Sequence, residues 1–128
     1  MSGDMHTPAH DQILIFQSVV TNVGNHYNKY NGAFTVPDHG VYVFTWTIVM
    51  PGNGYIYTQI LVNSNAVGSM STSAFGVDNQ RATTGIVVVS VNPGDVVFIK
   101  TNPHGSFNQN IISNPALYRT SFSGWKLF

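Results

Sequence analysis

The sequence contains no cysteine and no glutamate, and it has few charged residues of any kind. Without cysteine, the chain can form neither disulfides nor thiolate metal sites. Only 8% of the residues are charged, compared with about 25% in typical globular domains. Because helix surfaces depend on Glu, Lys and Arg, this depletion argues against a helical protein. The formal net charge is zero and there is no basic run, so we expect no nucleic-acid partner.

Long apolar runs are also missing from the chain. No segment approaches the roughly 20 apolar residues of a membrane span, so we expect no membrane insertion. The first residues, MSGDMHTPAHDQ, are polar and show no apolar stretch typical of a signal peptide. A chain of 128 residues fits one domain. We therefore predict a flexible N-terminal arm over residues 1–12 and a globular domain over residues 13–128.

Short apolar segments separated by turn residues make up the rest of the chain and predict an all-β domain. The clearest is residues 41–50, where Tyr, Phe, Trp, Ile and Met alternate with Val and Thr. The turn-forming sequence Asn92-Pro93-Gly94-Asp95 predicts a hairpin between residues 86–91 and 96–101, and residues 69–84 read as a polar loop. Further strands are expected over residues 13–20, 33–36, 55–68 and 117–128.

Strands with two apolar faces point to self-association. Both faces of the segment 41–50 carry apolar residues, so this strand cannot be half solvated. An exposed apolar face of several hundred Å² is rare on a monomer. The pattern therefore favours an oligomer, and the alternative is a thicker core within a single chain.

The region from Phe16 to Trp46 resembles the signature of the complement C1q globular domain. The pattern continues with a Pro-Gly-Asp-Val-Val turn at 93–97 and with a closing segment, SFSGWKLF, at 121–128. The family usually has Phe or Tyr at the position of Trp46, so this residue is a departure that keeps an aromatic ring. The spaced signature residues are Phe16, Asn22, Tyr27, Phe34, Gly40, Tyr42, Phe44 and Trp46.

The resemblance implies a ten-stranded jelly-roll sandwich of the C1q/TNF-like kind, assembled as a homotrimer. Most residues of the signature are expected to have a structural role rather than a role in ligand binding. Gly124 would allow close packing in a strand and Gly94 would allow a turn. The collagen stalk of the family is not present, because there is no Gly-x-y repeat. The aromatic residues expected in the core are Phe16, Phe34, Phe44 and Phe122.

Catalytic motifs are poorly supported, so we predict that the protein is not an enzyme and has no catalytic residues. No serine or histidine stands in a nucleophile elbow or another local catalytic signature. Five aspartates and no glutamate offer few members for a paired-carboxylate site. No glycine-rich phosphate loop follows a strand into a helix.

Asp78 is the candidate metal ligand. It lies in the loop AFGVDNQRAT, where several C1q-like domains place an aspartate that helps to hold calcium near the trimer apex. Calcium requires several oxygen ligands, which Asp78, Asn79, Gln80 and backbone carbonyls could supply around a three-fold axis. Calcium is thus the one candidate cofactor. The alternative is an ordinary solvated loop aspartate.

For ligand contacts we predict polar loops together with two strand aromatics. Amides and an imidazole suit sugar hydroxyls, and a guanidinium matches the carboxylate of an acidic sugar. Tyrosine rings could offer stacking faces. Each of these side chains has an alternative role as turn filler or rim contact. The predicted contact residues are Tyr55, Tyr57, Arg81, His104, Asn108, Gln109 and Asn110.

The resemblance to free-standing C1q-domain proteins of invertebrates implies a secreted recognition protein of innate immunity. We expect a homotrimeric lectin that binds microbial surface polysaccharides or sialylated glycans, with avidity raised by its three copies. One alternative is a cytokine-like (TNF-like) receptor-binding protein. The other is a structural component of the extracellular matrix.

Overall fold

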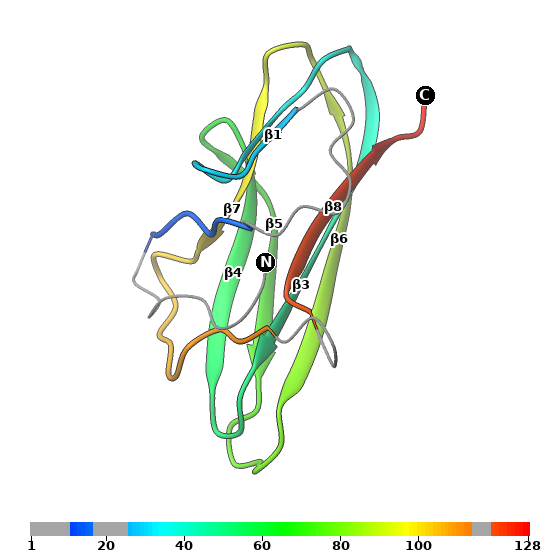
Figure 1. Ribbon diagram of the computed structural model, residues 1–128. Coiled ribbons are helices and arrows are strands. Elements are labelled where there is room, and N and C mark those ends of the chain that lie inside the picture. Colours follow the sequence, from blue (N-terminus) through cyan, green and yellow to red (C-terminus); the bar gives the residue numbers. More distant parts are fainter. Residues whose placement is uncertain (1–10, 17–25, 114–118) are drawn as a thin grey trace.

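The computed structural model describes residues 11–16, 26–113 and 119–128, and within them the protein is all-β. These residues form a five-stranded sheet of order β1-β2-β7-β4-β5 and a three-stranded sheet of order β6-β3-β8 (Figure 1). No helix that could cross a membrane occurs among them. The strands are β1 (Tyr27–Asn28), β2 (Ala33–Thr35), β3 (Gly40–Met50), β4 (Tyr55–Val62), β5 (Asn65–Ser73), β6 (Arg81–Val91), β7 (Val96–Thr101) and β8 (Ser121–Lys126).

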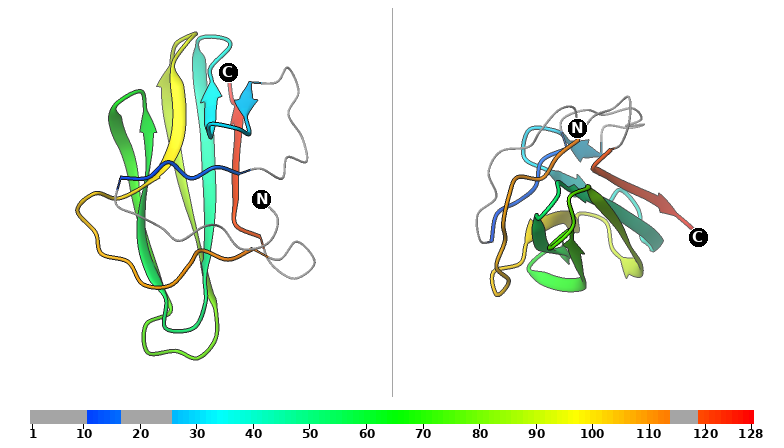
Figure 2. Two further views of the ribbon diagram at one scale, coloured as in Figure 1. Left: turned by 60° about the vertical axis from the view of Figure 1, so that its left-hand side comes forward. Right: turned by 90° about the horizontal axis from the view of Figure 1, so that it is seen from below.

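The connections between strands confirm the jelly-roll prediction. The chain crosses from one sheet to the other after β2, β3, β5, β6 and β7, and neighbouring strands within each described sheet are antiparallel. Two views of the ribbon show the sheets as two layers (Figure 2). Eight strands are described. Ile13 and Ile112 add isolated bridges to Lys100 and Val49.

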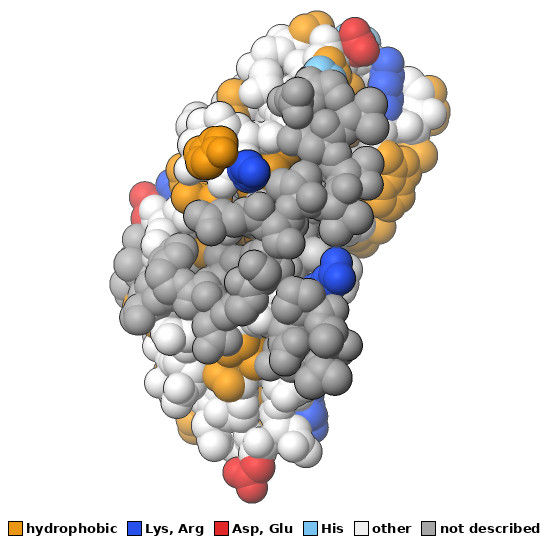
Figure 3. Space-filling model, viewed as in Figure 1, with side chains coloured by type: hydrophobic (Ala, Val, Ile, Leu, Met, Phe, Trp, Pro, Cys, Tyr) orange, Lys and Arg blue, Asp and Glu red, His pale blue; other side chains and the backbone are white. Residues whose placement is uncertain are grey.

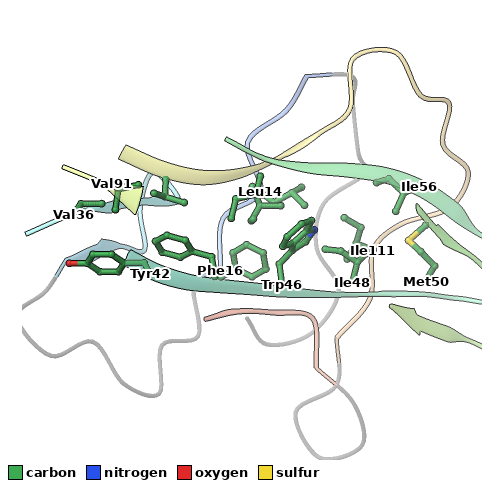
Figure 4. Close-up of a cluster of buried hydrophobic side chains, with 14 residues drawn as sticks. Leu14, Phe16, Val36, Tyr42, Trp46, Ile48, Met50, Ile56, Val91 and Ile111 are labelled. Atoms are coloured by element: carbon green, nitrogen blue, oxygen red, sulfur yellow. The ribbon is translucent and has the colours of Figure 1, made fainter. Parts of the chain in front are cut away.

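The core lies between the two sheets and is built on β3. The even-numbered side chains of this strand, from Tyr42 to Met50, are at most 3% exposed (Figure 4). The ring centroids of Phe34 and Phe44 lie 5.6 Å apart, and those of Phe44 and Phe122 lie 6.1 Å apart. These distances are typical of packed aromatic pairs, so the scaffold role predicted for these residues is confirmed.

The other face of the three-stranded sheet carries exposed apolar side chains around Val43, and threonines and serines such as Thr47, Thr84 and Ser121 towards its other end. Val43 of β3 pairs with Val88 of β6 on one side and with Trp125 of β8 on the other. Val88 is 62% exposed, Ile86 63% and Trp125 50%. Hydrophobic side chains gather on the right-hand flank in Figure 3. We call this surface, made of Val43, Ile86, Val88, Trp125 and Leu127, the outer apolar face. The prediction that β3 is apolar on both faces is confirmed.

Two sequence predictions about strands are wrong, and the first concerns residues 55–68. They do not form one strand: β4 ends at Val62, Asn63 takes a φ of 55°, and β5 begins at Asn65. The predicted polar loop 69–84 in fact contains the second half of β5 and the beginning of β6. β5 lies at the edge of its sheet, with Ser69, Ser71 and Ser73 exposed and only Met70 and Thr72 between them turned inward, so the segment gives little apolar signal.

The second wrong prediction is the hairpin between residues 86–91 and 96–101. The turn exists, with Gly94 at a φ of 86°, but β6 and β7 belong to different sheets. Val36 fixes the connection between β6 and β7 through two backbone hydrogen bonds: its N–H donates to the Asp95 carbonyl and its carbonyl accepts from the Gly94 N–H. A turn motif thus specified a reversal of the chain without specifying which strands pair.

The first predicted strand, residues 13–20, is only partly described. Ile13 forms a bridge to Lys100 and the Leu14 N–H donates to the Ile99 carbonyl at 2.8 Å. Residues 17–20 lie outside the described ranges, as do Asn22 of the signature and residues 117 and 118 of the last predicted strand. Of the predicted N-terminal arm only Asp11 and Gln12 are described. The Gln12 N–H donates to the Thr101 hydroxyl at 2.7 Å.

Gly85 makes room for the indole of Trp46. A Cβ added at Gly85 would stand 2.7 Å from two ring carbons of Trp46, whose Nε1 donates to the Thr58 hydroxyl at 3.0 Å. Because the indole ring is buried, it cannot move away from a methyl group added at Gly85. We expect Gly85→Ala to lower the free energy of unfolding by about 1–3 kcal/mol, the usual cost of overpacking. Urea unfolding at equilibrium would measure it.

The control is the same substitution in the Trp46→Phe background. The smaller phenyl ring leaves space for the added methyl group, so Gly85→Ala should cost clearly less there. An equal cost in both backgrounds would contradict the proposed contact.

Asp95 ties together the turns at the end of the sandwich opposite to the β3–β4 turn. Its carboxylate accepts the Asn92 N–H at 2.9 Å and the Asn63 side-chain amide at 3.1 Å. These hydrogen bonds, that from Asn92 first, lower the pKa of Asp95 below its usual value. These hydrogen bonds therefore stabilise the folded state fully when the pH is above the pKa of an unfolded aspartate, about 3.9. The stabilisation is lost as the pH falls through the lowered pKa of Asp95 in the folded state.

We expect Asp95→Asn to lower the melting temperature at pH 7 and to weaken its decline between about pH 4 and pH 2. Thermal melts over this pH range would measure both effects, with Asp78→Asn in an exposed loop as the control. An Asp95→Asn protein with an unchanged acid profile would refute the role of these hydrogen bonds.

Candidate functional site

Three connecting segments come together towards one end of the sandwich, the first two at the bottom of Figure 1 and the third along the left-hand side above them. They are the β3–β4 turn (51–54), the β5–β6 loop (74–80) and the segment that follows β7 (102–110). The Asn53 N–H donates to the carbonyls of Ala74 and Val77, both at 2.9 Å, and the Ala74 N–H donates to the Gly54 carbonyl at 2.7 Å. We call this region the three-loop end. Its first two members are joined through their backbones.

The segment after β7 attaches to the same end by pairing with β4. Tyr55 and Asn108 exchange backbone hydrogen bonds of 3.1 and 2.9 Å, and the Asn102 N–H donates to the Tyr57 carbonyl at 2.9 Å. The Asn108 side-chain amide donates to the Asn53 carbonyl at 3.2 Å. The segment thus continues along the edge of β4 beyond Thr101, where β7 ends.

Two glycines allow the loops to approach this closely. A Cβ at Gly52 would stand 2.5 Å from the carbonyl oxygen of Asp78, and a Cβ at Gly105 would stand 2.7 Å from the Tyr57 side chain. Such separations are shorter than real Cβ contacts, so any larger residue would push the loops apart. The three-loop end is therefore packed as one unit.

The structure brings most of the predicted contact residues together here. Tyr55, Tyr57 and Asn108 are direct neighbours through the pairing just described. The His104 N–H donates to the Asn102 side-chain oxygen at 2.9 Å, and Gln109, at a φ of 71°, lies against Gly54. Of the predicted contact residues on β4 and in the segment after β7, those with exposed side chains are His104, Asn108, Gln109, Asn110 and Tyr57.

Arg81 and Asp78 lie at the same end but on the side of the three-stranded sheet. Arg81 begins β6 and pairs with Met50, the last residue of β3. Its guanidinium donates to the Gln80 carbonyl at 3.1 Å. Both side chains are exposed. The predicted contacts therefore fall into an Arg81 side and a Tyr57 side.

One aromatic residue of the site was missed by the sequence analysis. Phe75 is 72% exposed, and its ring meets that of Tyr55 edge to face at a centroid distance of 5.9 Å. The residue after it, Gly76, takes a φ of 76°. The available signal was a large aromatic side chain next to glycine inside a polar loop, which is a common position for a surface contact.

The residues around Asp78 do not form a calcium cage within one chain. The Val77 carbonyl already accepts the Asn53 N–H, and the Gln80 carbonyl already accepts the Arg81 guanidinium. No group of three or more His, Cys, Asp or Glu residues gathers in the described part of the chain. Since calcium takes about six to eight oxygen ligands, Asp78 would need ligands from other copies. Calcium binding stays a prediction.

The fold defines the class of the protein as a jelly roll of the C1q/TNF-like kind. The globular domain of zebrafish complement 1qA superimposes with a TM-score of 0.74 at 18% identity, covering 99% of this chain and 93% of the other. The Eiger TNF of S. frugiperda gives a TM-score of 0.54 at 13% identity, covering 77% and 64%. Both likenesses concern the fold alone.

The family follows from the sequence comparison. The C1q domain family model matches residues 1–127. The chain belongs to the C1q domain family, as the spaced signature predicted. The human complement C1q and tumor necrosis factor-related protein 9A is 26% identical over 121 residues, which is 94% of this chain. The chain spans about a third, 35%, of the length of that relative.

Proposed function

We propose that the protein is a secreted homotrimeric recognition protein that binds glycans at the three-loop end and performs no catalysis. The observation that carries the proposal is the convergence of amides, an imidazole and tyrosines on one packed end of the sandwich. These groups donate and accept hydrogen bonds as sugar hydroxyls require, and they come from loops held by a rigid scaffold. Microbial surface polysaccharides and sialylated glycans are the candidate ligands, in a role in innate immunity.

The outer apolar face supports the trimer. Val88, Ile86 and Trp125 are side chains that water solvates poorly, and patches above about 300–600 Å² are rare on monomers. With zero formal net charge, copies of the chain repel one another weakly. Membership of the C1q family favours three-fold assembly over other symmetries. Three copies would place three glycan sites on one particle and raise its avidity for repetitive surfaces.

A second candidate function is binding to a cell-surface receptor in the manner of a cytokine. The observation in its favour is the fold likeness to Eiger TNF. In this alternative the contact surface would lie between neighbouring copies rather than at the loops. Nanomolar capture of a membrane receptor, together with no binding to any glycan, would favour it.

We expect light scattering at micromolar concentration to give a mass about three times that of the 14.0 kDa chain. Val88→Asp should reduce the mass to that of one chain, because three buried carboxylates would have to leave water at the interface. Val67→Asp is the matched control: Val67 is also an exposed strand valine but lies on β5. It should remain trimeric.

Thermal melts of both variants would show that each is folded. A wild-type mass near that of a single chain, or dissociation caused equally by both substitutions, would refute the assembly through the outer apolar face.

On an array of microbial polysaccharides and of neutral and sialylated oligosaccharides, we expect binding to at least one class. The array should be probed with calcium and with a chelator, using the wild type and Asp78→Asn. If Asp78 contributes to a shared calcium site, Asp78→Asn will remove the calcium dependence. Blank arrays under both conditions would refute the glycan proposal.

A further inference from the structure

The outward side of the β4–β5 hairpin carries tyrosine and serine side chains in register. Tyr55 lies opposite Ser73 and Tyr57 opposite Ser71. Directly opposite residues of an antiparallel pair project to the same face. The alternate residues Ile56 and Thr58 are buried in the core. One exposed surface therefore combines aromatic rings with a row of hydroxyl groups.

Tyr57 is fixed in place although it is 42% exposed. The backbone at Gly105 packs against the Cβ, Cγ and Cδ2 atoms of the tyrosine, at a distance that would exclude any side chain there. The Asn102 N–H holds the Tyr57 carbonyl at 2.9 Å. A ring supported from one side and open on the other is preorganised for stacking, so little side-chain entropy is lost on binding.

Phe75 supplies a second open ring at the end of the same surface. Its contact with Tyr55 is edge to face at 77°, and its N–H donates to the Ser73 hydroxyl at 3.3 Å. We call Tyr55, Tyr57, Phe75, Ser71 and Ser73 the aromatic platform. Its members come from β4, from β5 and from the β5–β6 loop, which the pairing at Asn53 and Ala74 holds together.

The platform itself carries no charge. Among the described residues, Lys100 shares its face, opposite Gln59, and this amine forms an ion pair with Asp11. Arg81 begins β6 in the other sheet and donates to the Gln80 carbonyl. An acidic sugar placed on the platform would lose hydration of its carboxylate without gaining a cationic partner. An uncharged sugar would lose nothing comparable.

Resting on the proposed glycan binding, we infer that the aromatic platform is the sugar site and that it takes uncharged sugars. The C–H face of a hexose would stack on the Tyr57 ring, with Phe75 flanking it. The hydroxyls of Ser71 and Ser73 would exchange hydrogen bonds with the sugar rim. This assigns the site to the Tyr57 side of the three-loop end and leaves Arg81 outside it.

The test uses immobilised oligosaccharides ending in mannose, galactose or N-acetylglucosamine, with their sialylated counterparts. We expect the wild type to bind a neutral set, and Tyr57→Ala and Phe75→Ala each to weaken this binding by about tenfold, the loss expected of one aromatic contact. Tyr57→Phe keeps the ring and should bind nearly as the wild type does. Arg81→Gln should leave neutral binding unchanged.

Tyr30→Ala is the matched control, because Tyr30 is an exposed aromatic residue that lies between β1 and β2, outside the aromatic platform. It should bind as the wild type does, and melting temperature and mass should show that all variants fold and assemble alike. Binding restricted to sialylated sugars and abolished by Arg81→Gln would overturn the inference while leaving the proposed glycan function intact. Equal losses for Tyr30→Ala and Tyr57→Ala would also overturn it. Failure to bind any sugar would overturn the glycan function itself.

Discussion

The structure depends on one constraint: β3 is apolar on both of its faces, and both faces must leave water. Its even-numbered side chains meet this requirement inside the chain, where they form the core with β4, β7 and the aromatic cluster. Its odd-numbered side chains lie between β6 and β8, which add the exposed apolar residues Ile86, Val88 and Trp125 to the same face. The chain alone covers Val43 and Val49, but it leaves Ile86, Val88 and Trp125 exposed. Association of copies follows from the same hydrophobic effect that builds the core.

This division leaves the other surfaces free for recognition. If copies meet through the outer apolar face, the five-stranded sheet and the three-loop end point away from the contact, because they belong to the opposite layer or to its lower rim (Figures 1 and 2). The sandwich then works as a rigid support, with packed glycines and backbone pairing at the loops in place of flexible connections. Ligand contacts on such a support need only a few side chains in fixed positions, such as the ring of Tyr57.

How far the sequence predicts this structure depends on the range of each signal. Alternation over residues 41–50 is local, and it correctly predicted both faces of β3. The spaced aromatics identified the family and the core. Local signals could not show that residues 92–95 join two different sheets, since strand pairing is set by contacts far apart in the sequence. The polar edge strand β5 was missed for lack of an apolar face. Phe75 was missed because its neighbour Tyr55 is distant in sequence.

The covering of the outer apolar face can be measured through the two tryptophans. Trp46 is buried in the core, whereas Trp125 is half exposed in a single chain and belongs to the outer apolar face. Iodide should therefore quench only Trp125. The account predicts almost no quenching at micromolar concentration, where copies cover Trp125, and strong quenching in Val88→Asp. Strong quenching of the wild type at a concentration where light scattering gives the mass of the trimer would show that Trp125 stays in water. That result would contradict the account.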